Sequence, residues 1–342
     1  MIRSKLSLAV MLYLASTAAF AAEATSSTNQ SADSTFHHEA EIGFLDTSEN
    51  SDGLASAKYS YYFQGVKQND APYELATFLS QSSVISARYA MTEHQDLYEL
   101  SGEYVFDSKF FVGGGYSRLS TERNWGPNTD LDTYELKAGY YFNPHAKFTL
   151  SYQTNSDSDS EHRSNDVYGD YNRDSSEDYD GFALEYQHYL PFESTSGLML
   201  TATGIYVKTD SKDIKKYDTI YINDADEVVE GVIESTGEQT EKATGLAINA
   251  DWYITNSWSV GGGYQYLNYD RKSSYSYSQE TVDKTSEDNT NYSDSDSRNI
   301  YTLNTSYFWH FSKYVSARAA IEQIFIDSDS GTSVGIALNG RF

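Results

Sequence analysis

The chain contains no cysteine and only 4 Pro in its 342 residues. The absence of Cys excludes disulfides, thiolate nucleophiles and Cys-ligated zinc. Basic residues are also scarce, because 24 Lys and Arg face 50 Asp and Glu and leave a formal charge of -26. Such strong acidity argues against a protein that binds nucleic-acid phosphates.

Long apolar runs are missing as well. After the first 21 residues, no stretch of about 18 apolar residues occurs, so no helix is expected to cross a membrane. Aromatic residues nevertheless make up 15% of the chain, although its mean hydropathy is -0.59. A chain this polar cannot fill a large soluble core, and it is too aromatic for disorder. A transmembrane β-barrel fits both properties, because its strands are apolar on one face and its girdles are aromatic.

The N-terminal residues predict export. Arg3 and Lys5 precede an apolar stretch over residues 6–20, and Ala19-Phe20-Ala21 supplies a small-x-small cleavage pattern. A single anchoring helix is the alternative, and it fits less well because the apolar run is short and ends in an Ala cluster. We therefore expect three parts, namely a signal peptide over residues 1–21, a flexible lead over 22–36, and a barrel over 37–342.

Apolar residues recur at every second position from His37 onward. This period turns one face of each strand to lipid or core and the other to water. A tilted membrane strand needs roughly 9–11 residues, and each segment marks the clearest alternating part of one such strand. The pattern predicts an all-β, transmembrane, antiparallel up-and-down β-barrel of about 14 strands, with 12 or 16 as rival counts. The segments are residues 40–44, 57–63, 85–91, 98–104, 110–116, 134–142, 146–152, 182–186, 198–202, 246–252, 258–264, 301–311, 315–321 and 334–342.

The connections between these segments alternate in length, as expected for outer-membrane barrels with tight periplasmic turns and long extracellular loops. The long connections, which include 153–178, 208–241 and 270–297, are strongly acidic and are expected to be solvated extracellular loops. Within them, Tyr217 to Ile233 is compatible with a hairpin above the membrane. Residues 65–81 break the pattern, because a periplasmic connection should be short; a lumen-facing fold, a short helix and an extra strand all remain open.

Many charged residues occupy the phase opposite to the apolar residues. Buried ions are costly unless they are paired or hydrated, and a barrel of this size encloses more width than side chains readily fill. A water-filled pore is therefore favoured over a narrow barrel plugged by paired charges. Mixed signs predict weak selectivity in the lumen, and the acidic loops add a cation bias that fades with salt. The predicted pore-lining residues are Lys58, Arg88, Glu99, Glu103, Lys109, Glu135, Lys137, Lys147, Glu185, Arg318 and Glu322.

The C-terminus alternates apolar residues up to a terminal aromatic, through Val334, Ile336, Leu338 and Phe342. This pattern resembles the last strand of bacterial outer-membrane proteins, which the barrel assembly machinery reads, so these residues are predicted as an assembly signal. A chance terminal Phe is the alternative. The seven His residues show no metal-ligand spacing, and no motif singles out a nucleophile. No metal, cofactor or catalytic residue is predicted.

One stretch carries a family resemblance. Tyr61-Tyr62-Phe63 is followed by the Pro-led segment 71–79, which ends in Phe-Leu, and by Ser82-Ser83-Val84. Here the chain resembles the putative general bacterial porin family of Gram-negative outer membranes, with its Tyr-rich second strand, Pro-led segment and Ser-rich third strand. The resemblance implies passive diffusion of small hydrophilic solutes and supplies no catalytic residues.

The sequence thus predicts an outer-membrane porin that is not an enzyme, with small hydrophilic solutes and ions passing through its lumen. A closed structural or adhesive barrel acting through its acidic loops is the alternative, followed by an outer-membrane hydrolase. The expected partners are outer-membrane lipid, the barrel assembly machinery, and lipopolysaccharide bridged through divalent cations at the acidic loops.

Overall fold

The computed structural model describes residues 34–48, 50–68, 71–122, 129–165, 169–222, 228–281, 285–327 and 329–342. The predicted signal peptide and most of the lead lie outside these residues. The first strand begins at Ser34, three residues before the alternation at His37. No helix in the described part of the chain is long and apolar enough to cross a membrane.

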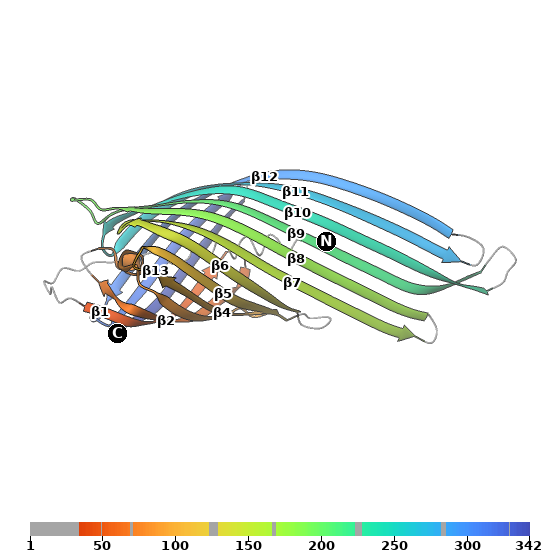
Figure 1. The fold of residues 1–342 in the computed structure, drawn as a ribbon, viewed down its shortest axis with the longest axis horizontal. Coiled ribbons are helices and arrows are strands. Elements are labelled where there is room, and N and C mark those ends of the chain that lie inside the picture. Colours follow the sequence, from red (N-terminus) through yellow and green to blue (C-terminus); the bar gives the residue numbers. More distant parts are fainter. Residues whose placement is uncertain are drawn as a thin grey trace.

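The prediction of 14 antiparallel strands is confirmed. Each predicted segment falls on one strand, except that the segments 301–311 and 334–342 run one residue past the ends of β12 and β14. Every strand pairs with its neighbours in sequence, and β1 pairs with β14, so the sheet closes into a barrel (Figure 1). The strands are β1 Ser34–Thr47, β2 Asn50–Gln68, β3 Val84–Met91, β4 Gln95–Val105, β5 Phe110–Thr121, β6 Thr129–Asn143, β7 Ala146–Asn165, β8 Gly169–Leu190, β9 Gly197–Ile222, β10 Val228–Thr255, β11 Trp258–Thr281, β12 Thr285–His310, β13 Val315–Ile326 and β14 Asp329–Arg341.

The two ends of the chain meet at the closing seam. Glu39 pairs with Arg341, and the ladder continues to Thr47 and Ser333. At its end, the His38 N–H donates to the Phe342 carbonyl at 2.7 Å, and the Phe342 N–H donates to the His38 carbonyl at 2.9 Å. Closure removes the free sheet edges that could not be satisfied inside a bilayer.

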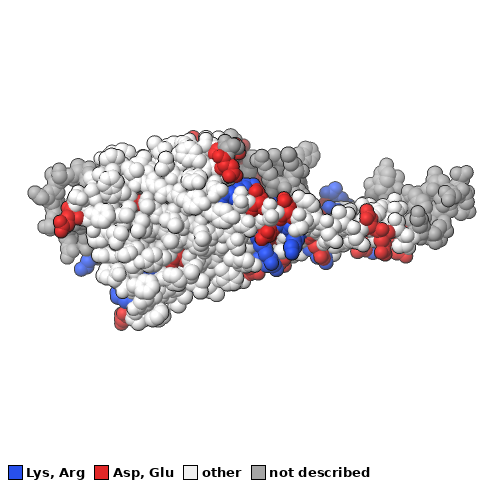
Figure 2. Space-filling model, turned by 90° about the horizontal axis from the view of Figure 1, so that it is seen from above, with Lys and Arg blue, Asp and Glu red and all other residues white. Residues whose placement is uncertain are grey.

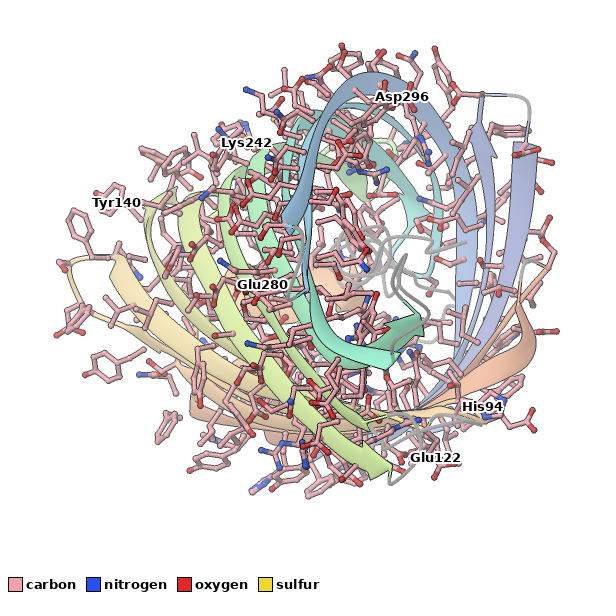
Figure 3. All side chains as sticks on the ribbon, turned by 90° about the vertical axis from the view of Figure 1, so that its right-hand side faces the viewer. His94, Glu122, Tyr140, Lys242, Glu280 and Asp296 are labelled. Atoms are coloured by element: carbon pink, nitrogen blue, oxygen red, sulfur yellow. The ribbon has the colours of Figure 1, made fainter. Side chains whose placement is uncertain are left out.

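The alternation in the sequence separates the two faces of the barrel wall, with apolar side chains outside and polar side chains inside. Large apolar side chains such as Leu136, Leu246 and Ile336 are 60% or more exposed on the outside. Figure 2 shows the consequence, a broad barrel surface that carries few charged residues before the charges gather where the long strands leave it. In Figure 3, which looks along the strands, Tyr140 and Lys242 project from the outer side of the wall. The uncharged surface is what contact with lipid tails requires.

Six strands, β7 to β12, are 20 to 28 residues long and continue well beyond the barrel (Figure 1). We call this part the extension. In β7 it comprises the residues after Asn155, where pairing with β6 ends. In β12 it comprises the residues before Ile300, where pairing with β13 begins. Most of the long acidic segments expected as loops are therefore paired strands. The pairing of Tyr217 with Ile233 confirms the hairpin between β9 and β10, although its turn lies outside the described residues.

The connection between β2 and β3 folds into the barrel. It forms a single turn of 3-10 helix, η1 Tyr73–Leu75, followed by the short helix α2 Ala76–Ser80. Of the three possibilities for residues 65–81, the lumen-facing fold and the short helix both apply, and the extra strand is wrong. We call Tyr73–Ser80 the inserted segment.

The close packing around Gly139, on the inner face of the barrel near the short turns, leads to a stability prediction. A Cβ on Gly139 in β6 would clash with the Phe148 carbonyl oxygen and with the Phe111 ring. Gly139→Ala should therefore lower the free energy of unfolding by about 1–3 kcal/mol. Guanidinium unfolding of the purified barrel, followed by Trp fluorescence, measures the change.

Gly204→Ala in β9 is the control, because its Cβ would meet no atom closer than 3.6 Å. Equal stability of the two variants would show that the close approach at Gly139 does not constrain the wall.

Candidate functional site

Ten of the eleven predicted pore-lining residues lie on strands, in the phase opposite to the exposed apolar side chains. The pairing registers place Lys58, Arg88 and Glu99 in one row across β2, β3 and β4. Lys109 is the exception, since it lies in the turn before β5 with a φ of 70°. Lys109 is thus placed at the end of the barrel with the short turns, which we call the turn end.

One side of the inner wall keeps solvent-accessible charge. Arg88 and Glu99 approach to 4.0 Å with side chains 20% and 37% exposed. Lys137 and Glu135 also approach to 4.0 Å on β6 and remain about one quarter exposed. Partly hydrated pairs at this distance attract weakly. These charges are therefore available to interact with water and ions in the lumen.

At the closing seam, two or three strands away, the inward charges form largely buried pairs. Arg318 on β13 pairs with Glu41 on β1 at 3.2 Å, and the Arg318 side chain is 6% exposed. Arg341 on β14 pairs with Glu39 on β1 at 2.8 Å, while the Tyr62 hydroxyl donates to the same Glu39 carboxylate at 2.7 Å. Removing one member of a buried pair leaves an uncompensated ion, so these pairs hold the seam in register.

The inserted segment begins beside these seam pairs and crosses to other strands. Leu75 packs with Tyr189, Met199 and Tyr253, which come from β8, β9 and β10. Phe78 reaches Tyr141 on β6, with ring centroids 6.3 Å apart. The inserted segment therefore spans the lumen from its origin between β2 and β3 to strands on the far wall.

Polar contacts fix the start of the inserted segment. Arg341 donates to the Tyr73 carbonyl at 3.1 Å, and the Tyr73 ring lies 4.1 Å from the His310 ring, centroid to centroid. The Tyr253 hydroxyl donates to the Glu74 carboxylate at 3.1 Å. Burial raises the pKa of Glu74 well above its ordinary value, and the nearby Asp251 carboxylate raises this pKa further.

Lys147 belongs to the same contact zone. Its ammonium nitrogen lies 5.8 Å from the centroid of the Phe78 ring, 5.7 Å from that of Phe111 and 5.9 Å from that of Tyr141. Cation–π attraction of this kind holds the cation against an aromatic cage. Lys147 thus lies on the inward face of β7 and contacts the inserted segment there.

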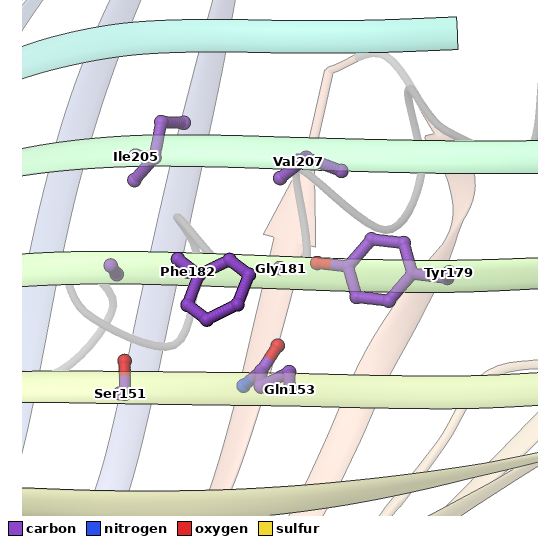
Figure 4. Close-up of a pocket in the computed structure, with 8 residues that line it drawn as sticks. Ser151, Gln153, Tyr179, Gly181, Phe182, Ile205 and Val207 are labelled. Atoms are coloured by element: carbon purple, nitrogen blue, oxygen red, sulfur yellow. The ribbon is translucent and has the colours of Figure 1, made fainter. Parts of the chain in front are cut away.

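An apolar patch interrupts the polar inner wall where the barrel passes into the extension. Tyr179, Val207, Ala243 and Leu267 pack together there and are at most 7% exposed. In Figure 4 the Tyr179 ring lies beside Gly181, where a Cβ would come within 2.7 Å of the Tyr179 hydroxyl. The inward position of Tyr179 therefore depends on glycine two residues later.

The sequence pattern predicts which charges share the inward phase of the strands. It does not predict which of them pair at the seam or contact the inserted segment. Glu39, Glu41 and Arg341 share the inward phase, yet they act as seam pairs beneath the inserted segment. Glu74 carried no signal at all, because no period marks residues 73–80 as lumen-facing. Among the described residues, no group of three or more His, Asp or Glu could hold a metal ion.

A family model described as putative general bacterial porin matches residues 4–284. The chain belongs to this family. The family resemblance noted in the sequence is thereby confirmed, and the barrel is of the porin type, located in the outer membrane.

One solved structure shows a similar fold. The porin-family chain is similar to the outer membrane protein Omp33 of Acinetobacter baumannii, with 15% identity, a TM-score of 0.50, and coverage of 90% of this chain and 99% of the other. It is also similar to a loop L8 deletion mutant of OmpT from Vibrio cholerae, at 11% identity and a TM-score of 0.39 over 90% and 98% of the chains. A comparison with curated proteins finds no match. At these identities the first likeness concerns the fold alone.

Leu75 anchors the inserted segment of this porin-family chain, and its truncation tests that role. Leu75→Ala should weaken docking by about 2 kcal/mol or more. Amide exchange of residues 73–80 should then accelerate by roughly thirtyfold, with the strands unaffected. Hydrogen–deuterium exchange with peptide-level mass spectrometry measures this effect.

Leu303→Ala is the matched control, because Leu303 is 59% exposed on the outer face. Unchanged exchange in Leu75→Ala would contradict the anchoring role.

Proposed function

We propose that this barrel allows passive diffusion of small hydrophilic solutes and ions across the outer membrane. The observation that carries the proposal is the solvent-accessible charge on the inner wall at Arg88–Glu99 and Glu135–Lys137. Charged side chains in a lumen require water, and a hydrated path through a closed barrel admits polar solutes without an energy source.

The inserted segment is the movable part of this pathway. It is eight residues long and contacts the far wall through a few side chains, mainly Leu75, Glu74 and Phe78. Local openings of such small, loosely anchored elements require far less free energy than unfolding of a sheet. In the proposal, solutes pass when the segment leaves the far wall, and the buried pairs at the seam stay in place.

The expected cation bias follows from the placement of charge. The extension adds acidic residues such as Asp157, Asp159 and Glu161 near one mouth of the pore. Their field concentrates cations before entry and is screened by salt. We expect reversal potentials to favour cations at low salt and to approach neutrality at high salt.

Export and assembly complete the proposal. Residues 1–21 would act as a cleaved signal peptide, and the short turns would lie in the periplasm with the extension outside the cell. Val334, Ile336 and Leu338 on β14, and Phe342 directly after it, are 45–60% exposed. This exposure supports recognition by the barrel assembly machinery during insertion. Contact with lipopolysaccharide through divalent cations stays a prediction from the acidity of the extension.

Bilayer conductance and liposome swelling test the proposed function. Replacing residues 73–80 with eight Gly and Ser residues keeps the length of the connection but removes its anchors. The wild type should pass ions and small sugars, and the replacement should raise single-channel conductance and admit larger sugars. The single variant Leu303→Ala serves as a control for surface changes and should conduct like the wild type.

If neither the wild type nor the replacement conducts, the closed structural barrel is the better account. Hydrolysis of lipids or peptides by the purified protein would instead support the hydrolase.

Glu74 predicts a pH dependence with a defined sign. Its pKa is raised in the docked segment, so docking binds a proton that a hydrated Glu74 would release. The stabilisation is present below the ordinary pKa of Glu and is lost as pH rises through the raised value. Arg318, Arg341 and the Tyr253 hydroxyl oppose the shift without reversing it. Conductance should therefore rise with pH.

Glu74→Gln keeps a neutral side chain and should give low conductance at every pH. Glu99→Gln, on the accessible wall, is the control and should retain the wild-type pH profile. A flat profile in the wild type, or an unchanged one in Glu74→Gln, would contradict the role of Glu74.

A further inference from the structure

The extension differs from the barrel because its sheet is open. Pairing of β12 with β13 begins at Ile300, while β12 itself begins at Thr285. The fifteen residues from Thr285 to Asn299 therefore pair with β11 on one side and with no described strand on the other. At about 3.4 Å per residue this edge is roughly 50 Å long.

The hydrogen bonds at the C-terminal end of β12 show which backbone N–H groups point away from β11. The Phe308 N–H donates to the Ser257 carbonyl on the β11 side, and the Phe311 N–H donates to the Val315 carbonyl on the β13 side. Because successive residues alternate and the register has no shift, odd-numbered residues point their N–H groups away from β11. In the extension these outward donors belong to Glu287, Asn289, Asn291, Ser293, Ser295 and Ser297.

One local contact supports this assignment. The Ser297 N–H bonds to the side-chain carboxylate of its neighbour Asp296 at 2.8 Å instead of a strand carbonyl. Residues 285–298 are all exposed, and they contain no proline. A long, unbroken edge of this kind is a template for a further strand.

Charge decides which strand fits. The edge carries Glu287, Asp288, Asp294 and Asp296, and its one base, Arg298, lies 3.6 Å from Asp296. The opposite edge on β7 carries Asp157, Asp159 and Glu161, with Arg163 paired to Glu161. Pairing between copies would place like charges side by side, which destabilises strand pairs. A segment that bears positive charge is complementary to the edge.

We propose that the Thr285–Asn299 edge of β12 binds an extended, Lys- or Arg-rich peptide segment by strand addition. The free N–H and C=O groups supply a main-chain ladder, and the acidic side chains select a cationic partner. This interaction is separate from solute passage, since the edge lies outside the barrel.

The test uses the full-length protein in nanodiscs and a fluorescent twelve-residue peptide of alternating Lys and Thr. The double variant Asn291→Pro/Ser295→Pro removes two outward donors and leaves the bonds to β11 intact. Fluorescence anisotropy should show peptide affinity reduced by about tenfold or more, because two ladder bonds are lost. A peptide with Glu in place of Lys should not bind.

Two matched controls separate backbone pairing from charge and from general damage. Asn291→Ala/Ser295→Ala keeps both N–H groups and should bind like the wild type. Ser158→Pro makes the same change on the opposite β7 edge and should also bind like the wild type. Glu287→Gln/Asp288→Asn, which leaves the backbone unchanged, should weaken binding and reduce its salt dependence even if the proline variant fails to fold.

Several results would overturn the proposal. Equal binding by the folded proline variant would mean that charge alone attracts the peptide, and absence of binding by the wild type would exclude this partner class. Self-association of the wild type in sedimentation, abolished by the proline pair, would assign the edge to a second copy of the chain.

Discussion

The closing ladder between β1 and β14 is the constraint on which the rest of the structure depends. Inside lipid an unpaired backbone group costs several kcal/mol, so a sheet spans a membrane only when its two ends join. Here the join is made by strands at opposite ends of the chain, from Glu39 paired with Arg341 to the mutual bonds of His38 and Phe342. Once the ring is closed, the period of two assigns each side chain to lipid or to the lumen.

The lumen that results is not uniform. Near β3, β4 and β6 its charges remain accessible. Near the seam Arg318, Arg341, Glu39 and Glu41 form largely buried pairs, and Arg341 also contacts the inserted segment. The segment reaches the far wall through Leu75 and Glu74. The Glu74 carboxyl group is buried near Asp251, so its ionisation destabilises an otherwise apolar contact. The contacts that hold the inserted segment across the lumen thus include the group whose ionisation would undock it.

The fold was largely predictable because apolar alternation is strong wherever a strand faces lipid, as in residues 134–142. The extension was not predictable in this way. Its strands, such as Thr285–His310, begin with Ser, Asp and Asn on both faces, so no apolar signal separates a hydrated strand from a loop. The role of Glu74 and the pairing of Glu39 with Arg341 depend on contacts across the closed ring, which local patterns do not encode.

A hydrated inner wall is the central claim, and the absence of native Cys allows a direct measurement. Lys137→Cys and Leu136→Cys place single thiols on adjacent residues of β6, one facing the lumen and the other 66% exposed on the outer face. The account predicts that a membrane-impermeant thiol reagent labels the folded barrel in bilayers rapidly at position 137 and slowly at 136. Protection of position 137 in both the wild-type background and the Gly/Ser replacement of residues 73–80 would show a dry interior and contradict it.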